Sequence, residues 1–190
     1  MGSAKALLTN EDDVAFVVAL SRAFIEAGLA PVIVTVPPAP TDTIIVDLLS
    51  ELPVHICFNE APHLGLSGSV ETALSKLPNN QAGLVFSPVD VPVASADLIG
   101  AMVEALTSPR SDWLAAVASH NGAPGHPVAF TRHLFGSLRT CGSSGGPRNV
   151  LRAHTDRVLE YEWNDPNILV NLNTPEAYRE TFGKSPRRAS

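Results

Sequence analysis

The sequence is poor in cysteine, in charge and in long apolar runs. Its 190 residues include two cysteines, Cys57 and Cys141, which are too few for a disulfide framework or for a zinc site of their own. Charged residues make up 17% and hydrophobic residues 45%, a composition too apolar for a disordered chain. No apolar run approaches the roughly 20 residues of a membrane-spanning helix, and the N-terminus lacks a secretory signal pattern.

The net charge of −6 limits the partners that we expect for the chain. An acidic protein has no general attraction for a polyphosphate, so we expect neither nucleic acid nor membrane as a partner, and any phosphate site must be local. These features predict a reduced, cytoplasmic protein. We expect a single domain over residues 1–182 and a basic, polar and frayed tail at 183–190.

Short apolar segments alternate along the chain with longer amphipathic ones, which predicts an α/β fold. The segment 31–36 is almost wholly apolar, as is typical of a parallel strand buried on both faces. We predict a Rossmann-like, doubly wound and mostly parallel sheet, with helices on both faces and functional loops at the carboxyl ends of the strands. The expected helices cover 12–28, 42–50, 69–77, 95–106 and a segment from Thr174, and the expected strands cover 31–36, 53–58, 82–89, 113–118, 159–163 and 168–172.

Asp90 is the strongest single candidate for a functional residue. It follows the buried apolar run Gly83–Phe86, where an unpaired carboxylate would be costly. It is either a turn or capping aspartate, or a ligand that holds Mg²⁺ against phosphates. Asn171 and Asn173 lie on either side of Leu172, and alternation in a strand would place both amides on one side. Amide oxygens suit Mg²⁺ or a ribose hydroxyl.

Other candidates stand beside glycine-rich segments. Gly65–Ser69 precedes an expected helix, where backbone N–H groups can approach an anion, although such segments are common. Lys5 can meet a phosphate as a point charge or can remain solvated.

Two segments rich in glycine and proline, 122–127 and 142–147, are expected to be loops that flank a strand and a helix. His126 in the first is most simply a turn histidine. Arg148, which follows the second, can bind a phosphate or cap the preceding carbonyl groups.

Together these segments resemble the MobA/MocA-like nucleotidyltransferases. Met1–Leu8 is similar to the second half of the family's N-terminal signature, whose first half is a strand and a glycine-rich loop. Further similar segments, in the family's order, are Asn59 with Gly65–Ser69, Asp90–Pro92, Gly125–Val128 and Asn171–Glu176. Gly125–Val128 is similar to the cytidylyltransferase-like branch, whereas Gly142–Arg148 departs from the family pattern by lacking its acidic residue.

The resemblance implies a nucleotide-diphospho-sugar transferase-like fold. It also implies Mg²⁺-dependent transfer of NMP from an NTP, with CTP favoured and GTP possible, to a phosphorylated acceptor such as molybdopterin. The roles that it implies are catalysis by Lys5 and Asp90, nucleotide binding by Gly2, Lys5, Gly65, Ser67 and Ser69, acceptor binding by His126 and Arg148, and metal binding by Asp90, Asn171 and Asn173. The alternative is a non-catalytic nucleotide-binding or accessory protein of the same fold, and a sugar-nucleotide-binding transferase is a third interpretation from fold analogy.

The first strand and most of the glycine-rich loop of the family signature have no counterpart in these 190 residues. That strand is expected at the centre of the sheet, beside 31–36 or 82–89. Without it, two strands would have bare edges, through which we expect chains to associate. We expect upstream, in-frame codons for an apolar strand and loop, and marginal folding and poor NTP binding without them.

Overall fold

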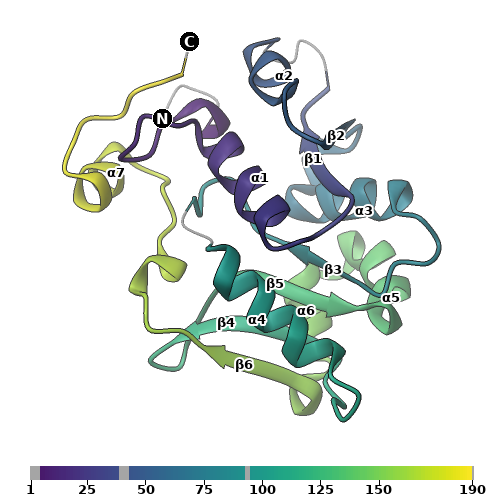
Figure 1. The fold of residues 1–190 in the computed structure, drawn as a ribbon. Helices are drawn as coiled ribbons and strands as arrows, with labels where there is room; N and C mark the ends of the chain where they lie inside the picture. Colours follow the sequence, from purple (N-terminus) through teal and green to yellow (C-terminus); the bar gives the residue numbers. More distant parts are fainter. Residues whose placement is uncertain (1–4, 39–42, 93–94, 190) are drawn as a thin grey trace.

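The structure, a computed structural model, describes residues 5–38, 43–92 and 95–189. Helices and strands alternate along most of the chain (Figure 1). The helices are α1 (Phe16–Glu26), α2 (Thr43–Leu49), α3 (Leu66–Lys76), α4 (Ala96–Thr107), α5 (Phe135–Arg139), α6 (Pro147–Arg152) and α7 (Pro175–Phe182). The strands are β1 (Val32–Val36), β2 (Val54–Phe58), β3 (Gly83–Phe86), β4 (Ala115–His120), β5 (Ala123–Thr131) and β6 (Val158–Glu162). None of the described helices is both long and apolar enough to cross a bilayer.

The described strands form two sheets. β1 and β2 pair in parallel, with Val32 opposite Val54. The second sheet has the order β3-β5-β4-β6, in which β5 is antiparallel to both neighbours and β4 is parallel to β6. Asn121 and Gly122 join β4 to β5 with φ values of 52° and 75°, the left-handed conformation that a tight hairpin turn requires. This hairpin reverses the chain, so the second sheet is mixed rather than mostly parallel.

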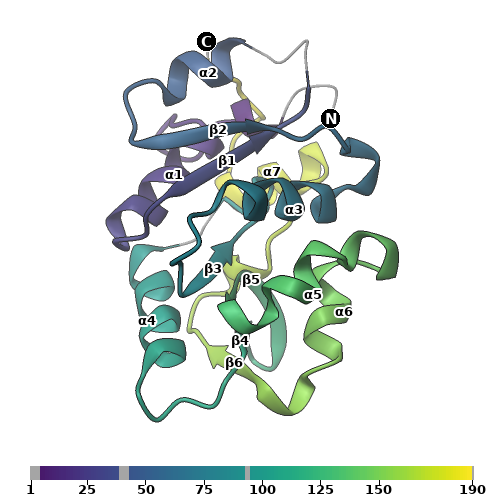
Figure 2. The ribbon, with the colours of Figure 1, turned by 90° about the vertical axis from the view of Figure 1, so that its right-hand side faces the viewer.

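Helices cover both faces of the strands, which confirms the expected α/β fold class. On β4, Ala115 and Val117 belong to the core cluster that includes residues of α3, α5 and α6. Ala116 and Ala118 belong instead to the cluster with α4. Figure 2 shows α1 and α4 on one side of the strands and α3, α5 and α6 on the other. The alternation along β4 therefore builds two apolar layers, as expected for a strand buried on both faces.

The prediction of a loop at 122–127 is wrong, because most of this segment lies in β5. The turn ends at Gly122. The pairing of β4 with β5 shifts register between Val117 and Ser119 of β4, and this shift accommodates the irregular part of β5 that follows the turn. A Cβ on Gly125 would lie 2.4 Å from the carbonyl oxygen of Ile168. Glycine is thus required there, since two backbone segments approach each other closely.

The expected strand at 168–172 is also wrong. Pro166–Leu169 form a 3₁₀ helix, and Asp165 caps it by accepting a hydrogen bond from the Asn167 N–H over 2.9 Å. A proline at its start favours the turn over a strand, because proline cannot donate to a ladder.

Both ends of the chain differ from expectation. α1 begins at Phe16 rather than at residue 12, because Asn10 Oδ1 accepts from the Asp12 and Val14 N–H groups and forms a turn. The tail is not frayed where the structure describes it. The Thr9 N–H donates to the Arg187 carbonyl over 3.1 Å, so the last residues run beside the first ones.

Candidate functional site

Lys5, Asp90 and Asn173 meet at the centre of the candidate site. Lys5 Nζ lies 2.7 Å from Asp90 Oδ2 and also donates to Asn173 Oδ1. The side chains of Lys5 and Asp90 are 31% and 17% exposed, so the ion pair is partly shielded yet open to a ligand. A carboxylate oxygen and an amide oxygen therefore point to one cationic position.

Asp90 reaches this position because β3 ends earlier than expected. The strand stops at Phe86, and the chain then turns, with the Val91 N–H donating to the Pro88 carbonyl over 3.1 Å. The turn leaves the Asp90 side chain at the carboxyl end of the strand. That is the edge of an α/β sheet where ligands generally bind.

Asn173 is brought to Asp90 by the backbone that precedes α7. The Leu172 N–H donates to the Asp90 carbonyl over 2.9 Å. Leu172 is buried, whereas Asn171 and Asn173 are exposed, so the expected alternation holds without a strand. Thr174 accepts from the Ala177 N–H over 3.2 Å and caps α7, as its sequence context predicts.

His126 is close enough to Asp90 to be affected by its charge. Its ring centroid is 6.1 Å from that of Phe86 at the end of β3. Burial lowers the pKa of His126, Asp90 raises it, and Arg148 lowers it, in that order of size. The imidazole therefore favours its neutral form. Among the described residues, Nδ1 of His126 is buried with no hydrogen-bond partner, so it can accept or donate a bond to a bound polar group.

The start of α3 is fixed to the end of β2 by Asn59. This buried side chain donates from Nδ2 to Ser69 Oγ over 3.3 Å and accepts from the Ala61 N–H over 2.9 Å. A Cβ on Gly68 would lie 2.5 Å from the Ala61 carbonyl oxygen, so this packing requires glycine. Gly65 precedes the helix with a φ of 57°.

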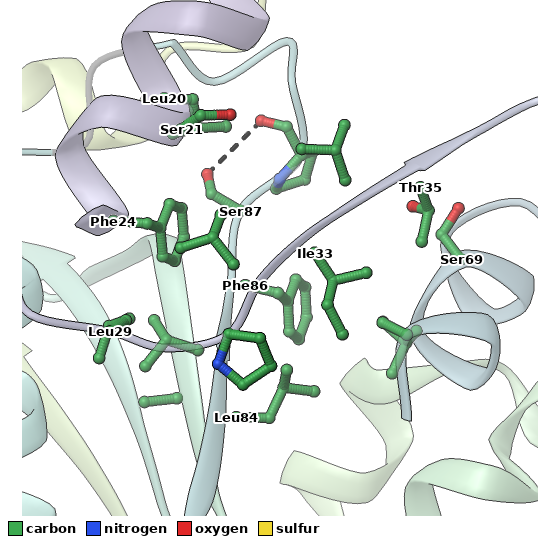
Figure 3. Close-up of a pocket in the computed structure, with 18 of the residues that line it drawn as sticks. Leu20, Ser21, Phe24, Leu29, Ile33, Thr35, Ser69, Leu84, Phe86 and Ser87 are labelled. Carbon is green, nitrogen blue, oxygen red and sulfur yellow. Dashed lines mark hydrogen bonds between the residues drawn. The ribbon is translucent and has the colours of Figure 1, made fainter. Parts of the chain in front are cut away.

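A cavity of about 740 Å³ separates β1 from β3. In the described part of the chain, β1 pairs with β2 alone and β3 with β5 alone, so the two edges that face the cavity have no ladder partner. Lys5 and Asp90 also line it. Figure 3 shows its walls, which include Ile33 and Thr35 of β1, Leu84 and Phe86 of β3, Leu20, Ser21 and Phe24 of α1, and Ser69 of α3. The cavity lies where we expected a further central strand.

The structure therefore brings most of the predicted site residues to one region. Lys5, Asp90 and Asn173 are in contact, and the charges of Asp90 and Arg148 act on His126. Ser69 lines the cavity, whereas Ser67 is buried. Asn171 is exposed beside the cluster, and Gly2 lies outside the described residues.

Sequence reasoning missed Glu71 as a site residue. Its carboxylate accepts a hydrogen bond from the Gly142 N–H over 3.1 Å. The signal that would have found it is its spacing of four residues from Ser67, which places both side chains on one face of α3.

Residues 1–158 match the family model described as a MobA-like NTP transferase domain. The chain belongs to this family. A comparison with curated proteins found no match.

Solved structures share the fold of this MobA-like chain at low sequence identity. Rv0371c of Mycobacterium tuberculosis H37Rv, in complex with manganese, is 21% identical with a TM-score of 0.75, over 96% of this chain and 94% of that one. 4-Diphosphocytidyl-2C-methyl-D-erythritol synthase of Anaerococcus prevotii is 12% identical with a TM-score of 0.74, over 90% and 86%. Molybdopterin-guanine dinucleotide biosynthesis protein A of Archaeoglobus fulgidus is 12% identical with a TM-score of 0.64, over 96% and 90%. At these identities the likeness shows the fold alone.

Proposed function

We propose that this MobA-like chain is a Mg²⁺-dependent nucleotidyltransferase. An oxygen of a phosphorylated acceptor attacks the α-phosphorus of an NTP, the bond from that phosphorus to its bridging oxygen breaks, and pyrophosphate leaves. The observation that carries the proposal is the convergence of Asp90 and Asn173 oxygens on Lys5 Nζ. Such a transfer depends mainly on alignment and on neutralisation of phosphate charge, which are the tasks that these groups suit.

Asp90 and Asn173 are the proposed core of the metal site, with Asn171 beside them. Their oxygens are hard donors, and the bond that each accepts from Lys5 Nζ shows that they already face one cation position. Within residues 5–38, 43–92 and 95–189, no group of three or more His, Cys, Asp or Glu side chains forms a metal cluster. A site with few protein ligands is typical of Mg²⁺, which keeps waters and substrate phosphates as its other ligands. Bound there, the ion would neutralise phosphate charge.

Lys5 is the proposed phosphate contact of the nucleotide. Its ammonium is held at the carboxyl end of β3, and it can move from Asp90 to a phosphate oxygen without leaving the site. Gly65, Ser67, Ser69 and Gly2 are assigned to the nucleotide on the resemblance. CTP is the favoured nucleotide and GTP the alternative, because Gly125–Val128 is similar to the cytidylyltransferase-like branch.

His126 and Arg148 are the proposed acceptor contacts. A guanidinium suits the phosphate of the acceptor, and the free Nδ1 of His126 suits a second polar group. The resemblance makes molybdopterin the proposed acceptor. A cytoplasmic location is proposed because two cysteines are too few for a disulfide framework, which is the usual mark of an oxidising compartment.

Pyrophosphate release from CTP and from GTP, with and without Mg²⁺, tests the proposal in the wild type and in Asp90→Asn. The variant keeps the shape of the side chain and removes the charge that a hard cation requires. We expect a loss of at least about tenfold in rate, which corresponds to about 1.4 kcal/mol of barrier. Asp47→Asn, an exposed aspartate of α2, is the matched control. Full activity of Asp90→Asn would show that another residue holds the metal.

The cavity between β1 and β3 favours a second candidate function, a nucleotide-binding or accessory protein without catalysis. The described residues place no glycine-rich loop between these strands, where the family signature would supply one. The same unpaired edges support the proposal that chains associate through this gap. Nucleotide binding without Mg²⁺-dependent pyrophosphate release would favour this candidate over the enzyme.

A further inference from the structure

One face of α3 contacts the loop at residues 141–146, which leads to Arg148. Ser67 and Glu71 are one helical turn apart on this face. Glu71 accepts a hydrogen bond from the Gly142 N–H over 3.1 Å. Burial raises the pKa of the neighbouring Cys141 thiol, and Ser67 opposes that rise as a hydrogen-bond partner. The loop is therefore tied to α3 through the contact between Glu71 and Gly142.

The loop packs closely against two side chains of α3. A Cβ on Gly142 would lie 2.8 Å from Glu71 Oε1, and a Cβ on Gly146 would lie 2.9 Å from Ser67 Oγ. The Gly146 N–H donates to the Cys141 carbonyl over 2.8 Å and closes the loop. α6 begins directly afterwards at Pro147, so the position of Arg148 follows from the position of the loop.

The two ends of this connection face different parts of the site. The first turn of α3 carries Ser69, which lines the cavity between β1 and β3 and is fixed by Asn59. The loop leads into α6, which carries Arg148, and the charge of Arg148 acts on His126. α3 thus contacts both groups of residues.

We propose that Glu71 is a positioning residue that holds Arg148 for a phosphate monoester. This inference rests on the proposed function, since it assigns the acceptor side of the same site. The Glu71 carboxylate suits the task because a hydrogen bond from a backbone N–H to a charged acceptor is stronger than one to a neutral acceptor. In this proposal Glu71 has no direct role in nucleotide binding.

Titrations of the whole chain test the inference with two probes, phenyl phosphate and CTP with Mg²⁺. Glu71→Ala removes the acceptor of the Gly142 N–H, and we expect the Kd for phenyl phosphate to rise about tenfold, or about 1.4 kcal/mol. The Kd for CTP should stay unchanged. Glu71→Gln keeps an oxygen that can accept the bond and should retain most of the affinity. Glu104→Ala, on the exposed side of α4, is the control for a lost glutamate.

Gly142→Ala approaches the same contact from the loop. Its new Cβ displaces the Glu71 carboxylate, so we expect the same selective rise in the Kd for phenyl phosphate. Because both changes break one contact, the double variant should be no weaker than either single variant. NMR of the Gly142 amide should show the broken bond in Glu71→Ala and its retention in Glu71→Gln.

Three results would overturn the inference. They are an unchanged Kd for phenyl phosphate in Glu71→Ala, an equal rise for both probes, which indicates general unfolding, and no binding of phenyl phosphate by the wild type at millimolar concentration. Failure of the proposed function would give a different result. The wild type would then release no pyrophosphate, while Glu71→Ala would still selectively raise the Kd for phenyl phosphate.

Discussion

Lys5 and Asp90 stand 85 residues apart in the sequence, yet Lys5 Nζ lies 2.7 Å from Asp90 Oδ2. An ion pair that is partly open to water contributes only about 0–1 kcal/mol to stability. The ion pair therefore contributes little to the stability of the fold. Its geometry instead presents a carboxylate and an ammonium together, which suits the proposed binding of a metal-bound triphosphate.

Lys5→Ala is expected to weaken NTP binding by about tenfold, because it removes a point charge from the phosphate site. The melting temperature should change little, for the reason given above. Lys184→Ala is the matched control, since Lys184 Nζ lies 2.8 Å from Asp13 Oδ1 on the surface. Equal losses of NTP affinity in the two variants would point to net charge rather than to a site.

His126 makes the stability of the protein depend on pH. Burial lowers its pKa in the folded state below the ordinary value of 6.5, so the unfolded chain takes up the proton more readily. The contribution is fully present above pH 6.5 and is lost as the pH falls toward the folded-state pKa. We expect the free energy of unfolding to fall between about pH 7.5 and about pH 5.5.

His126→Gln should show a smaller fall over the same range, measured by urea unfolding at both pH values. His55→Gln is the control, because His55 is exposed on β2. A wild type and a His126→Gln variant with the same pH dependence would contradict the prediction.

An apolar strand and a glycine-rich loop, added upstream of Met1, should raise the melting temperature. Each apolar side chain that the cavity buries would contribute roughly 1.5–3 kcal/mol. Four or five of them approach the roughly 5–15 kcal/mol of a typical domain. The addition should also tighten the weak Mg²⁺-dependent NTP binding of the 190-residue chain, and sedimentation should show less association. An extension of the same length with serine and aspartate in the strand is the control.

The same experiment can contradict this account. The 190-residue chain would then melt cooperatively as a monomer above the roughly 45–65 °C of ordinary mesophilic domains, or bind NTP with micromolar affinity, without the extension.

Gly125→Ala is expected to destabilise the protein by more than about 1 kcal/mol. The new Cβ would meet the Ile168 carbonyl at 2.4 Å, and backbone cannot move aside as a side chain can. Gly100→Ala is the control, since nothing lies within 4 Å of a Cβ there, within α4. It should stabilise by about 0.5–1 kcal/mol through helix propensity. Thermal melts of both variants check the prediction.

The alternation of elements could be predicted because each strand carries an apolar run and each helix its own apolar face. The first half of β5 was missed because the sequence Gly125-His126-Pro127 is typical of a loop, and the register shift that accommodates it depends on contact with β4. The missed 3₁₀ helix at Pro166–Leu169 has a similar cause, since Ile168-Leu169-Val170 reads as a strand in isolation.

The site was predictable to the extent that its residues follow strand and helix ends. Asp90 and Thr174 are such residues, and local sequence indicates both. The contact between Glu71 and Gly142 could not be predicted, because it depends on how two distant segments pack. The same holds for the pairing of the tail with Leu7–Thr9.

Paramagnetic broadening by Mn²⁺ in NMR spectra of the whole chain tests the central claim most directly. With CTP present, Mn²⁺ should broaden the backbone amide of Asp90 and the side-chain amide of Asn173 first. Excess Mg²⁺ should reverse the broadening, and Asp90→Asn should abolish it. Broadening centred on residues away from Asp90 and Asn173, or undiminished in Asp90→Asn, would contradict the assignment of the metal site.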